Sequence, residues 1–104
     1  MKTTKTVVDG VCVISLDGRL DTITTPQVQP DIDAVIDEYK NVALDFSGVT
    51  YISSAGLRIL LAGHKRAAAA GGSLKLAHVS GQIMEIFEMT GFAGILKIEA
   101  DHRQ

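Results

Sequence analysis

Residues 45–61, DFSGVTYISSAGLRILL, decide how the rest of the chain is interpreted. The short apolar run Val42–Phe46 follows a predicted helix and reads as a buried strand that ends inside this stretch. The residues that follow, 47–52, are expected to form a loop. Two adjacent hydroxyls, Ser53 and Ser54, therefore fall where a loop becomes the first turn of a helix.

The helix that begins at this junction is expected to run from about Ser54 to Ala70, where Gly71-Gly72 ends it. Its inward face is predicted to carry Leu57, Leu60, Leu61, His64 and Ala68. Three basic residues are expected to lie mainly on a solvated face, although they could also meet acidic partner residues or balance a phosphate: Arg58, Lys65 and Arg66. The small residues Ala55 and Gly56 are expected to leave the surface around the serines open.

The helix before this stretch presents one apolar face, made by Val28, Ile32, Val35, Ile36 and Tyr39. Pro26 is typical of a first helical turn, whereas Pro30 would clash with the turn before it. We therefore expect either a start near Pro30 or an irregular first turn. A start near Pro30 would place Asp31 and Asp33 at the positive end of the helix dipole.

The remaining elements follow from turn residues and from hydrophobic periodicity. Asp9-Gly10 predicts a hairpin, and Asp17-Gly18 is expected to end its second strand before a loop at Gly18–Asp21. The other predicted elements are strands at Thr4–Val8, Val11–Leu16 and Leu74–Ala77, a helix capped by Ser80 and ended by Gly91, a short last strand within Ile95–Ile98, and a frayed polar tail over Glu99–Gln104. The order β-β-α-β-α-β-α(-β) predicts one α/β domain over residues 1–104, a mixed sheet with helices mainly on one face.

Composition narrows the function classes. The chain has 104 residues, 46% of them hydrophobic, with 10 basic and 12 acidic side chains, so no basic excess supports nucleic-acid binding. No apolar stretch approaches the ~18–20 residues that span a bilayer, and the N-terminus lacks a signal-peptide pattern. We expect a soluble, cytoplasmic domain without membrane insertion. The single cysteine, Cys12, is expected to be a small buried side chain.

Metal and enzyme sites are not predicted. His78 and His102 have no neighbours at metal-ligand spacing, and His64 is expected at the edge of the core. No histidine is arranged locally as a base for Ser53 or Ser54, and no phosphate-binding Gly-x-x-x-x-Gly-Lys loop exists. We expect no cofactor and no catalytic residue, so the domain is more readily a substrate of enzymes than an enzyme.

The junction itself has a structural role and a functional one. Ser53 is placed to cap the helix by accepting a bond from the N–H of Ala55 or Gly56. A helix N-terminus also tolerates an anion, so a phosphate on Ser54 would be accommodated there. Asp45 has two interpretations: a carboxylate beside Ser54, or, as we favour, an acceptor for N–H groups of the turn at Ser47-Gly48.

These motifs together resemble the STAS domain, and specifically the bacterial anti-sigma factor antagonists. The resemblance covers nearly the whole chain. It rests on the early hairpin, the Gly-x-Leu-Asp loop at Gly18–Asp21, the Asp-x-Ser-x-Val segment at Asp45, the Ser-x-Gly-Leu start at Ser54, the Gly71-Gly72 pair, and Met89-Thr-Gly-Phe92 in the closing helix. It implies that an anti-sigma factor with serine kinase activity phosphorylates Ser54 and that a PP2C-type phosphatase reverses the modification.

The implied docking surface comprises Asp21, Thr24, Ser53, Ser54, Gly56 and Arg58. Two departures from the family pattern matter. The family often has an aspartate where this chain has Ser53, which leaves Ser53 as a second candidate for phosphorylation. Pro30, in the first helix, can reshape a flank of the surface.

Two alternatives from other classes stay open. The family also includes regulatory subunits of membrane transport systems, so co-purification with a transporter ATPase would favour that role. A nucleotide-binding sensor is a weaker alternative, which titration with ATP and GTP tests.

Overall fold

The computed structural model describes residues 1–99; the predicted frayed tail beyond Glu99, with His102, lies outside the described residues. The helices and strands, in chain order, are β1 (Lys2–Val8), β2 (Val11–Leu20), α1 (Thr25–Tyr39), β3 (Asn41–Ile52), α2 (Ser54–Ala69), β4 (Ser73–Ala77), α3 (Gly81–Thr90), the 3₁₀ turn η1 (Phe92–Gly94) and β5 (Lys97–Ile98). This order confirms the predicted sequence of elements, including the short last strand.

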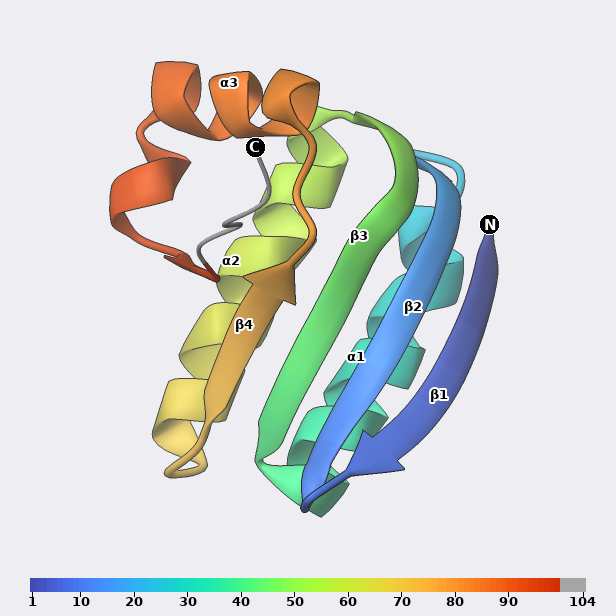
Figure 1. The fold of residues 1–104 in the computed structure, drawn as a ribbon, viewed down its shortest axis with the longest axis vertical. Coiled ribbons are helices and arrows are strands. Elements are labelled where there is room, and N and C mark those ends of the chain that lie inside the picture. The colour runs from blue at the N-terminus through green and yellow to red at the C-terminus, as the bar shows by residue number, and fades with distance from the viewer. Residues whose placement is uncertain (100–104) are drawn as a thin grey trace.

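The strands form a single mixed sheet. Its five strands lie in the order β1-β2-β3-β4-β5, with β1 antiparallel to β2 and every other neighbouring pair parallel. Figure 1 shows α1 and α2 side by side on one face of the sheet, with α3 across the end where β3 and β4 finish. Helices mainly on one face were predicted, because parallel strands need helical crossovers and these pack on the side that the right-handed connection selects.

Two strands are longer than their sequences suggested. Asp9 and Gly10 have φ values of 52° and 79°, which confirms the hairpin turn, but β2 then continues past Asp17-Gly18 to Leu20. In the same way, β3 continues to Ile52, so the loop predicted at residues 47–52 is wrong. The extended parts pair with each other through two register shifts, which absorb the polar residues that suggested a loop.

Helix α1 begins at Thr25 and continues through Pro30, so a start near Pro30 is wrong. The carbonyl of Thr24 accepts from both Gln27 N (3.0 Å) and Val28 N (3.1 Å), a shared bond that is common at helix ends, so the irregular first turn stays a prediction. Pro30 is exposed, so water can satisfy the carbonyl that its missing N–H leaves free. Asp31 and Asp33 consequently lie beyond the first turn and not at the positive end of the dipole.

The buried face of α2 is rotated from the predicted one. Its buried residues are Ala55, Gly56, Leu57, Ile59, Leu60, Gly63 and Ala67. Leu61 and His64 are half-buried and Ala68 is exposed, so the prediction for Ala68 is wrong. The difference arises because glycines on this face let the helix backbone approach its neighbours: a Cβ on Gly63 would lie 2.9 Å from Leu74 Cδ2.

Helix α3 closes the core at the end of the sheet. The Ser80 hydroxyl accepts from Ile83 N at 3.2 Å, and Gly91, with φ of 83°, ends the helix as predicted. Phe87 is fully buried and its ring centroid lies 6.3 Å from that of Phe46 in β3. Met84 is half-buried, whereas Met89 is 86% exposed and contributes little to the core.

Candidate functional site

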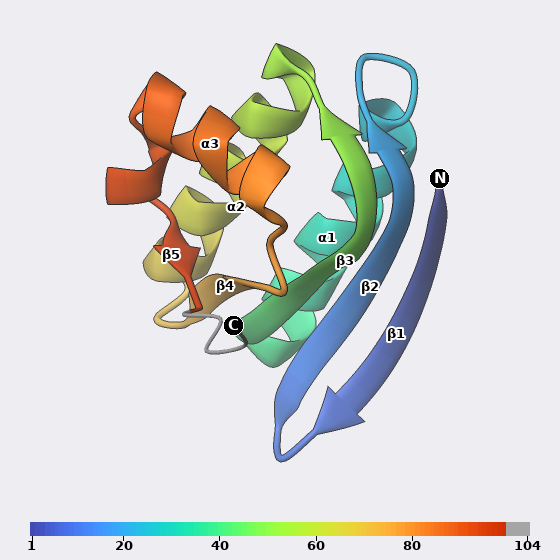
Figure 2. The same cartoon turned by 45° about the horizontal axis from the view of Figure 1, so that its top comes forward.

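The site is built where the loop between β2 and α1 meets the junction between β3 and α2. The main-chain N–H of Ser53 donates to the carbonyl of Leu20 at 3.0 Å, which joins the two connections directly. Figure 2 shows both connections at the same end of the sheet, next to each other. This is the carboxyl end of the parallel strands, where α/β sheets commonly place their sites.

The two adjacent serines occupy different positions. Ser53 has an extended backbone (φ −102°, ψ 178°), is half-buried, and its Oγ accepts from Gly56 N at 3.5 Å, so it caps α2 as predicted. Ser54 is the first helical residue and is exposed. Of the two hydroxyls, that of Ser54 is therefore the one free of a helix-capping role and accessible to an approaching protein.

The loop before α1 is fixed by its own side chains. The Asp21 carboxylate accepts from Ile23 N (3.0 Å) and Thr24 N (3.1 Å), while Thr24 Oγ1 donates to the carbonyl of Arg19 at 2.7 Å. The bond from Thr24 N, together with those from Ile23 N and Arg19, lowers the pKa of Asp21 below its usual value and outweighs desolvation. Asp21 and Thr24 therefore give this loop, which is part of the predicted docking surface, a defined shape.

Gly56 lies beneath the surface. It is buried, and a Cβ there would lie 2.7 Å from Ile52 Cγ1 and 2.8 Å from the carbonyl oxygen of Leu20. The expectation that Ala55 and Gly56 leave the surface open is wrong, since both are buried against the sheet. Gly56 instead allows α2 to pack closely against the end of β2, which sets the position of the adjacent serines.

The basic residues of α2 separate into two groups. Arg58 is exposed one turn after Ser54, on the same side of the helix, and makes no ion pair within residues 1–99. Arg66 donates to both carboxylate oxygens of Asp37 on α1, at 2.9 and 2.7 Å. Arg66 is paired with Asp37 of α1 and lies roughly 18 Å along the helix from Ser54, so it cannot balance a phosphate on Ser54. Lys65 is exposed, as expected for a solvated face.

Asp45 lies away from the junction. It sits within β3 and not at its end, seven residues before Ile52, which is roughly 23 Å along an extended strand. Its carboxylate accepts from Ser47 N at 3.0 Å and from the Ser15 hydroxyl at 3.2 Å. Burial alone would raise its pKa, but these hydrogen bonds, with nearby His78, lower it overall. The favoured interpretation, an acceptor for Ser47, is confirmed.

The structure also reveals surface residues that sequence reasoning missed. Ile23 is 76% exposed in the loop that Asp21 fixes, and Tyr51, 40% exposed, is the second-last residue of β3, two positions before Ser53. The guanidinium of Arg19 stacks over the Tyr51 ring, 4.2 Å from its centroid. An isoleucine within the polar run Asp21–Thr25 was the available signal, because a turn rarely needs a large apolar residue.

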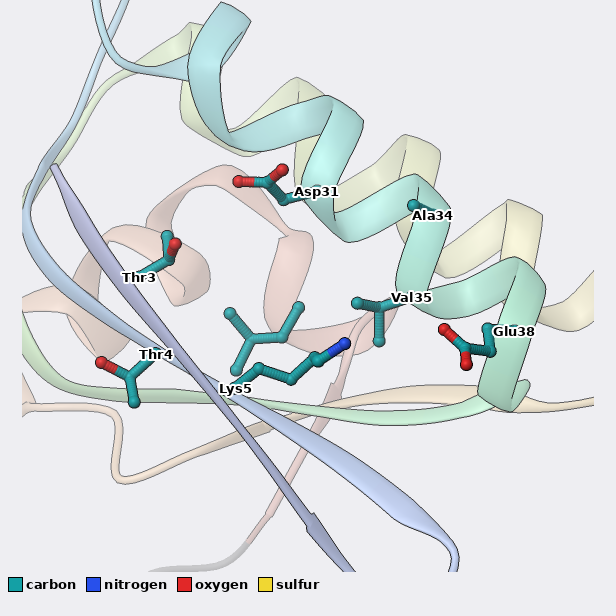
Figure 3. Close-up of a pocket in the computed structure, with 8 residues that line it drawn as sticks. Thr3, Thr4, Lys5, Asp31, Ala34, Val35 and Glu38 are labelled. Carbon is teal, nitrogen blue, oxygen red and sulfur yellow. The ribbon is translucent and has the colours of Figure 1, made fainter.

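Pockets occur elsewhere on the molecule. One of about 300 Å³ lies between β1 and α1, and Figure 3 shows Lys5 of β1 pointing toward Val35 and Glu38 of α1. This pocket shares no residue with the junction.

Among residues 1–99 there is no cluster of three or more His, Cys, Asp or Glu side chains that could bind a metal. Within the same residues, no helix has both the length and the apolar character needed to cross a bilayer.

Comparison with known proteins places these features in a family. A family model described as the STAS domain matches residues 2–104. The chain is 32% identical over 99 residues to BtrV of Bordetella bronchiseptica, a candidate anti-sigma factor antagonist, covering 94% of this chain and 85% of that protein. It is 25% identical over 87 residues to the anti-sigma-B factor antagonist of Bacillus subtilis, covering 84% and 80%.

Solved structures share the fold. A candidate anti-sigma factor antagonist from Thermotoga maritima superposes with a TM-score of 0.87 at 19% identity, over 96% of this chain and 87% of that one. The antagonist SpoIIAA in its unphosphorylated form gives 0.73 at 18% identity, over 96% and 89%. A sulfate transporter family protein from Wolinella succinogenes gives 0.77 at 21% identity, over 90% and 80%. At these identities the structural likeness shows the fold alone.

Proposed function

The chain belongs to the STAS domain family, among the anti-sigma factor antagonists, and on that premise we propose that it works as a phosphorylation-controlled partner switch. Its unphosphorylated form binds an anti-sigma factor that is also a serine kinase, and the sigma factor is thereby released. Phosphorylation of Ser54 ends this binding, and a PP2C-type phosphatase restores it. The chain acts as a regulatory binding protein in the cytoplasm of a bacterium and catalyses no reaction itself.

One observation carries the proposal: the exposed Ser54 begins α2 directly beside the loop fixed by Asp21. Ser53 already serves as the cap, so modification of Ser54 leaves the helix start intact. A relative by fold, SpoIIAA of Bacillus, has been solved in a phosphorylated form, which supports a phosphorylated state for chains of this architecture.

The physical effect of the phosphate is local. A phosphoserine adds about −1.5 to −2 charges at neutral pH. The Asp21 carboxylate is ionised at that pH, and its lowered pKa acts in the same direction, so the surface would then carry both negative groups. A partner surface that accepts the neutral hydroxyl must now desolvate or repel a dianion. A loss of about 3 kcal/mol weakens binding more than a hundredfold.

The proposal is tested by binding measurements with the purified anti-sigma factor of the source organism. Ser54→Ala should bind with the affinity of the unphosphorylated protein and no longer respond to kinase and ATP. Ser54→Asp should bind at least tenfold more weakly, whereas Ser53→Asp, which keeps a capping oxygen, serves as the matched control. Full-strength binding by Ser54→Asp and by the phosphorylated protein would refute the switch.

Mass spectrometry of the protein from its native cells locates the modification. A phosphate on Ser54 that phosphatase treatment removes is the expected result. A phosphate on Ser53 instead would move the switch to the residue that caps α2, and the helix start would then be perturbed by the modification. The absence of phosphate under all growth conditions would overturn the phosphorylation step.

A second candidate function has a specific observation behind it. The Wolinella succinogenes protein of the sulfate transporter family has the same fold, with a TM-score of 0.77. A regulatory subunit of a transport system would use the same exposed end of the sheet to contact a transporter. Stable co-purification with a transporter ATPase, in place of an anti-sigma factor, would favour this role.

A further inference from the structure

The docking surface contains an apolar side chain that the fold does not need. Among residues 1–99, six large apolar side chains are at least 40% exposed: Val7, Val8, Ile23, Tyr51, Met89 and Ile95. Ile23 and Tyr51 flank the junction that bears Ser54, and Ile23, at 76%, contributes almost nothing to the core. An isoleucine kept in water gives no stability to the isolated domain, because its benefit comes only from burial.

Ile23 is also presented rigidly. Its own N–H donates to Asp21 Oδ1 at 3.0 Å, and the next residue, Thr24, bonds to both Asp21 and the carbonyl of Arg19. The loop is further joined to the start of α2 through the bond from Ser53 N to Leu20 O. A side chain on a loop that is already ordered loses less conformational entropy on binding than one on a mobile loop.

The surroundings of Ile23 complete a small interaction surface. Arg19, whose side chain is 61% exposed, bridges Asp21 (3.4 Å) and the face of Tyr51 (4.2 Å to the ring centroid). Tyr and Arg are the residue types that most often dominate binding energy at protein interfaces. Arg58, exposed and without an ion pair in the described residues, adds a positive charge on the Ser54 side.

We propose that Ile23 is the apolar anchor of the docking surface, inserted into an apolar pocket of the anti-sigma factor that is flanked by a carboxylate facing Arg58. This inference rests on the proposed function and adds a residue that contributes strongly to the affinity for the partner. Phosphorylation of Ser54 would then add negative charge near Ile23 and cause the partner to dissociate. The anchor supplies affinity and the serine supplies control.

The matched control is a methionine of similar exposure elsewhere. Met89 is 86% exposed and is the second-last residue of α3. Figures 1 and 2 both show this end of α3 on the side of the molecule away from the loop between β2 and α1. Truncating Met89 therefore removes comparable exposed apolar area without touching the proposed anchor.

The experiment compares dissociation constants of full-length variants for the purified anti-sigma factor of the source organism. Ile23→Ala removes about three carbons from the pocket and should weaken binding about 50-fold. Ile23→Val should restore most of the affinity, and Met89→Ala should change it less than twofold. Arg58→Gln should slow association and reduce its dependence on salt. Thermal unfolding confirms that each variant is folded, since all three side chains are exposed.

The outcomes separate this inference from the proposed function. If Ile23→Ala binds the anti-sigma factor as tightly as Met89→Ala does, while Ser54→Asp binds it weakly, the role of Ile23 is refuted and the phosphorylation switch stands. If Ile23→Ala binds the anti-sigma factor weakly while Ser54→Asp binds it normally, the role of Ile23 stands and the phosphorylation switch fails. A loss for Ile23→Ala that Ile23→Val does not recover would also refute an apolar pocket, because a valine retains most of the buried area.

Discussion

One main-chain hydrogen bond joins neighbouring connections at each end of the parallel strands, but at the carboxyl end several polar side chains also fix the loops. Ser73 N donates to the carbonyl of Lys40 at 3.0 Å, and Gly72 packs directly against that same residue. At the other end, Asp21, Thr24 and Ser53 use side-chain oxygens to fix their loops. The first end can change little without loss of the fold, whereas the second can vary its exposed residues while its shape is kept.

The largest expected effect tests the amino end. A Cβ on Gly72 would overlap the carbonyl group of Lys40, and backbone atoms cannot move aside cheaply. Gly72→Ala should destabilise the domain by about 3 kcal/mol, which lowers the melting temperature by roughly 12–24 °C. Binding of the remaining folded protein to the anti-sigma factor should be unchanged.

The control for this variant is Gly81→Ala, because no atom lies within 4 Å of a Cβ at that position. It should unfold at the temperature of the native protein or slightly above it, since alanine favours helix more than glycine does. Equal melting temperatures for the two variants would break the comparison, because they would show that the amino end tolerates backbone displacement.

The next effect concerns the glycine beneath the docking surface. Gly56→Ala would bring a Cβ against the carbonyl oxygen of Leu20 (2.8 Å), so we expect a destabilisation of about 2 kcal/mol and weaker partner binding. At Gly63, in the same helix, the one close contact of a new Cβ is with the end of the Leu74 side chain at 2.9 Å, so Gly63→Ala should cost less than half as much. Chemical denaturation of both variants measures the difference, and an equal loss would contradict it.

A smaller effect is expected from the helix cap. Ser53→Ala removes the oxygen that accepts from Gly56 N, but the bond is long, at 3.5 Å. We expect a loss of about 0.5–1 kcal/mol, measurable by urea denaturation, with Ser54→Ala as the neutral neighbour. A larger loss for Ser54→Ala would mean that the second serine caps the helix, and the assignment of roles to the two serines would reverse.

The smallest effect is a dependence on pH. The pKa of Asp21 is lowered in the folded protein, first by the bond from Thr24 N. Its contribution to stability is therefore present above the unfolded pKa of about 3.9 and disappears as pH falls through the lower folded value. Asp21→Asn should be slightly less stable than the native protein at pH 7, and the gap should close as the pH falls through the lowered folded pKa of Asp21. A gap that is constant with pH would show that the carboxylate charge is unimportant.

Much of the architecture followed from local signals. Asp9-Gly10, Ser80 and Gly91 each specify a turn or a helix end through backbone angles or one hydrogen bond to a near neighbour, so they could be assigned without knowledge of the fold. The same is true of the Ser53 cap. The assignment of Ser54 as phosphoacceptor came from the family resemblance and stays a prediction.

The lengths of β2 and β3 could not be derived in the same way. Ser47, Gly48 and Thr50 suggest a loop, yet residues 47–52 form a strand because β2 supplies hydrogen-bond partners from about 30 positions away, through two register shifts. Once β3 reaches Ile52, Asp45 lies far from the serines, so its role near Ser54 was excluded only by the strand's true length.

The sequence by itself determined the order of the elements, their caps and turns, and the presence of two serines at a helix start, because each depends on contacts within a few residues. Only the tertiary structure decided which of the glycines is buried, that Arg66 pairs with Asp37 while Arg58 stays available, and that Ile23 projects from a rigid loop. Burial and ion pairing depend on helices and strands that are distant in the sequence, so they cannot be read from the neighbouring residues.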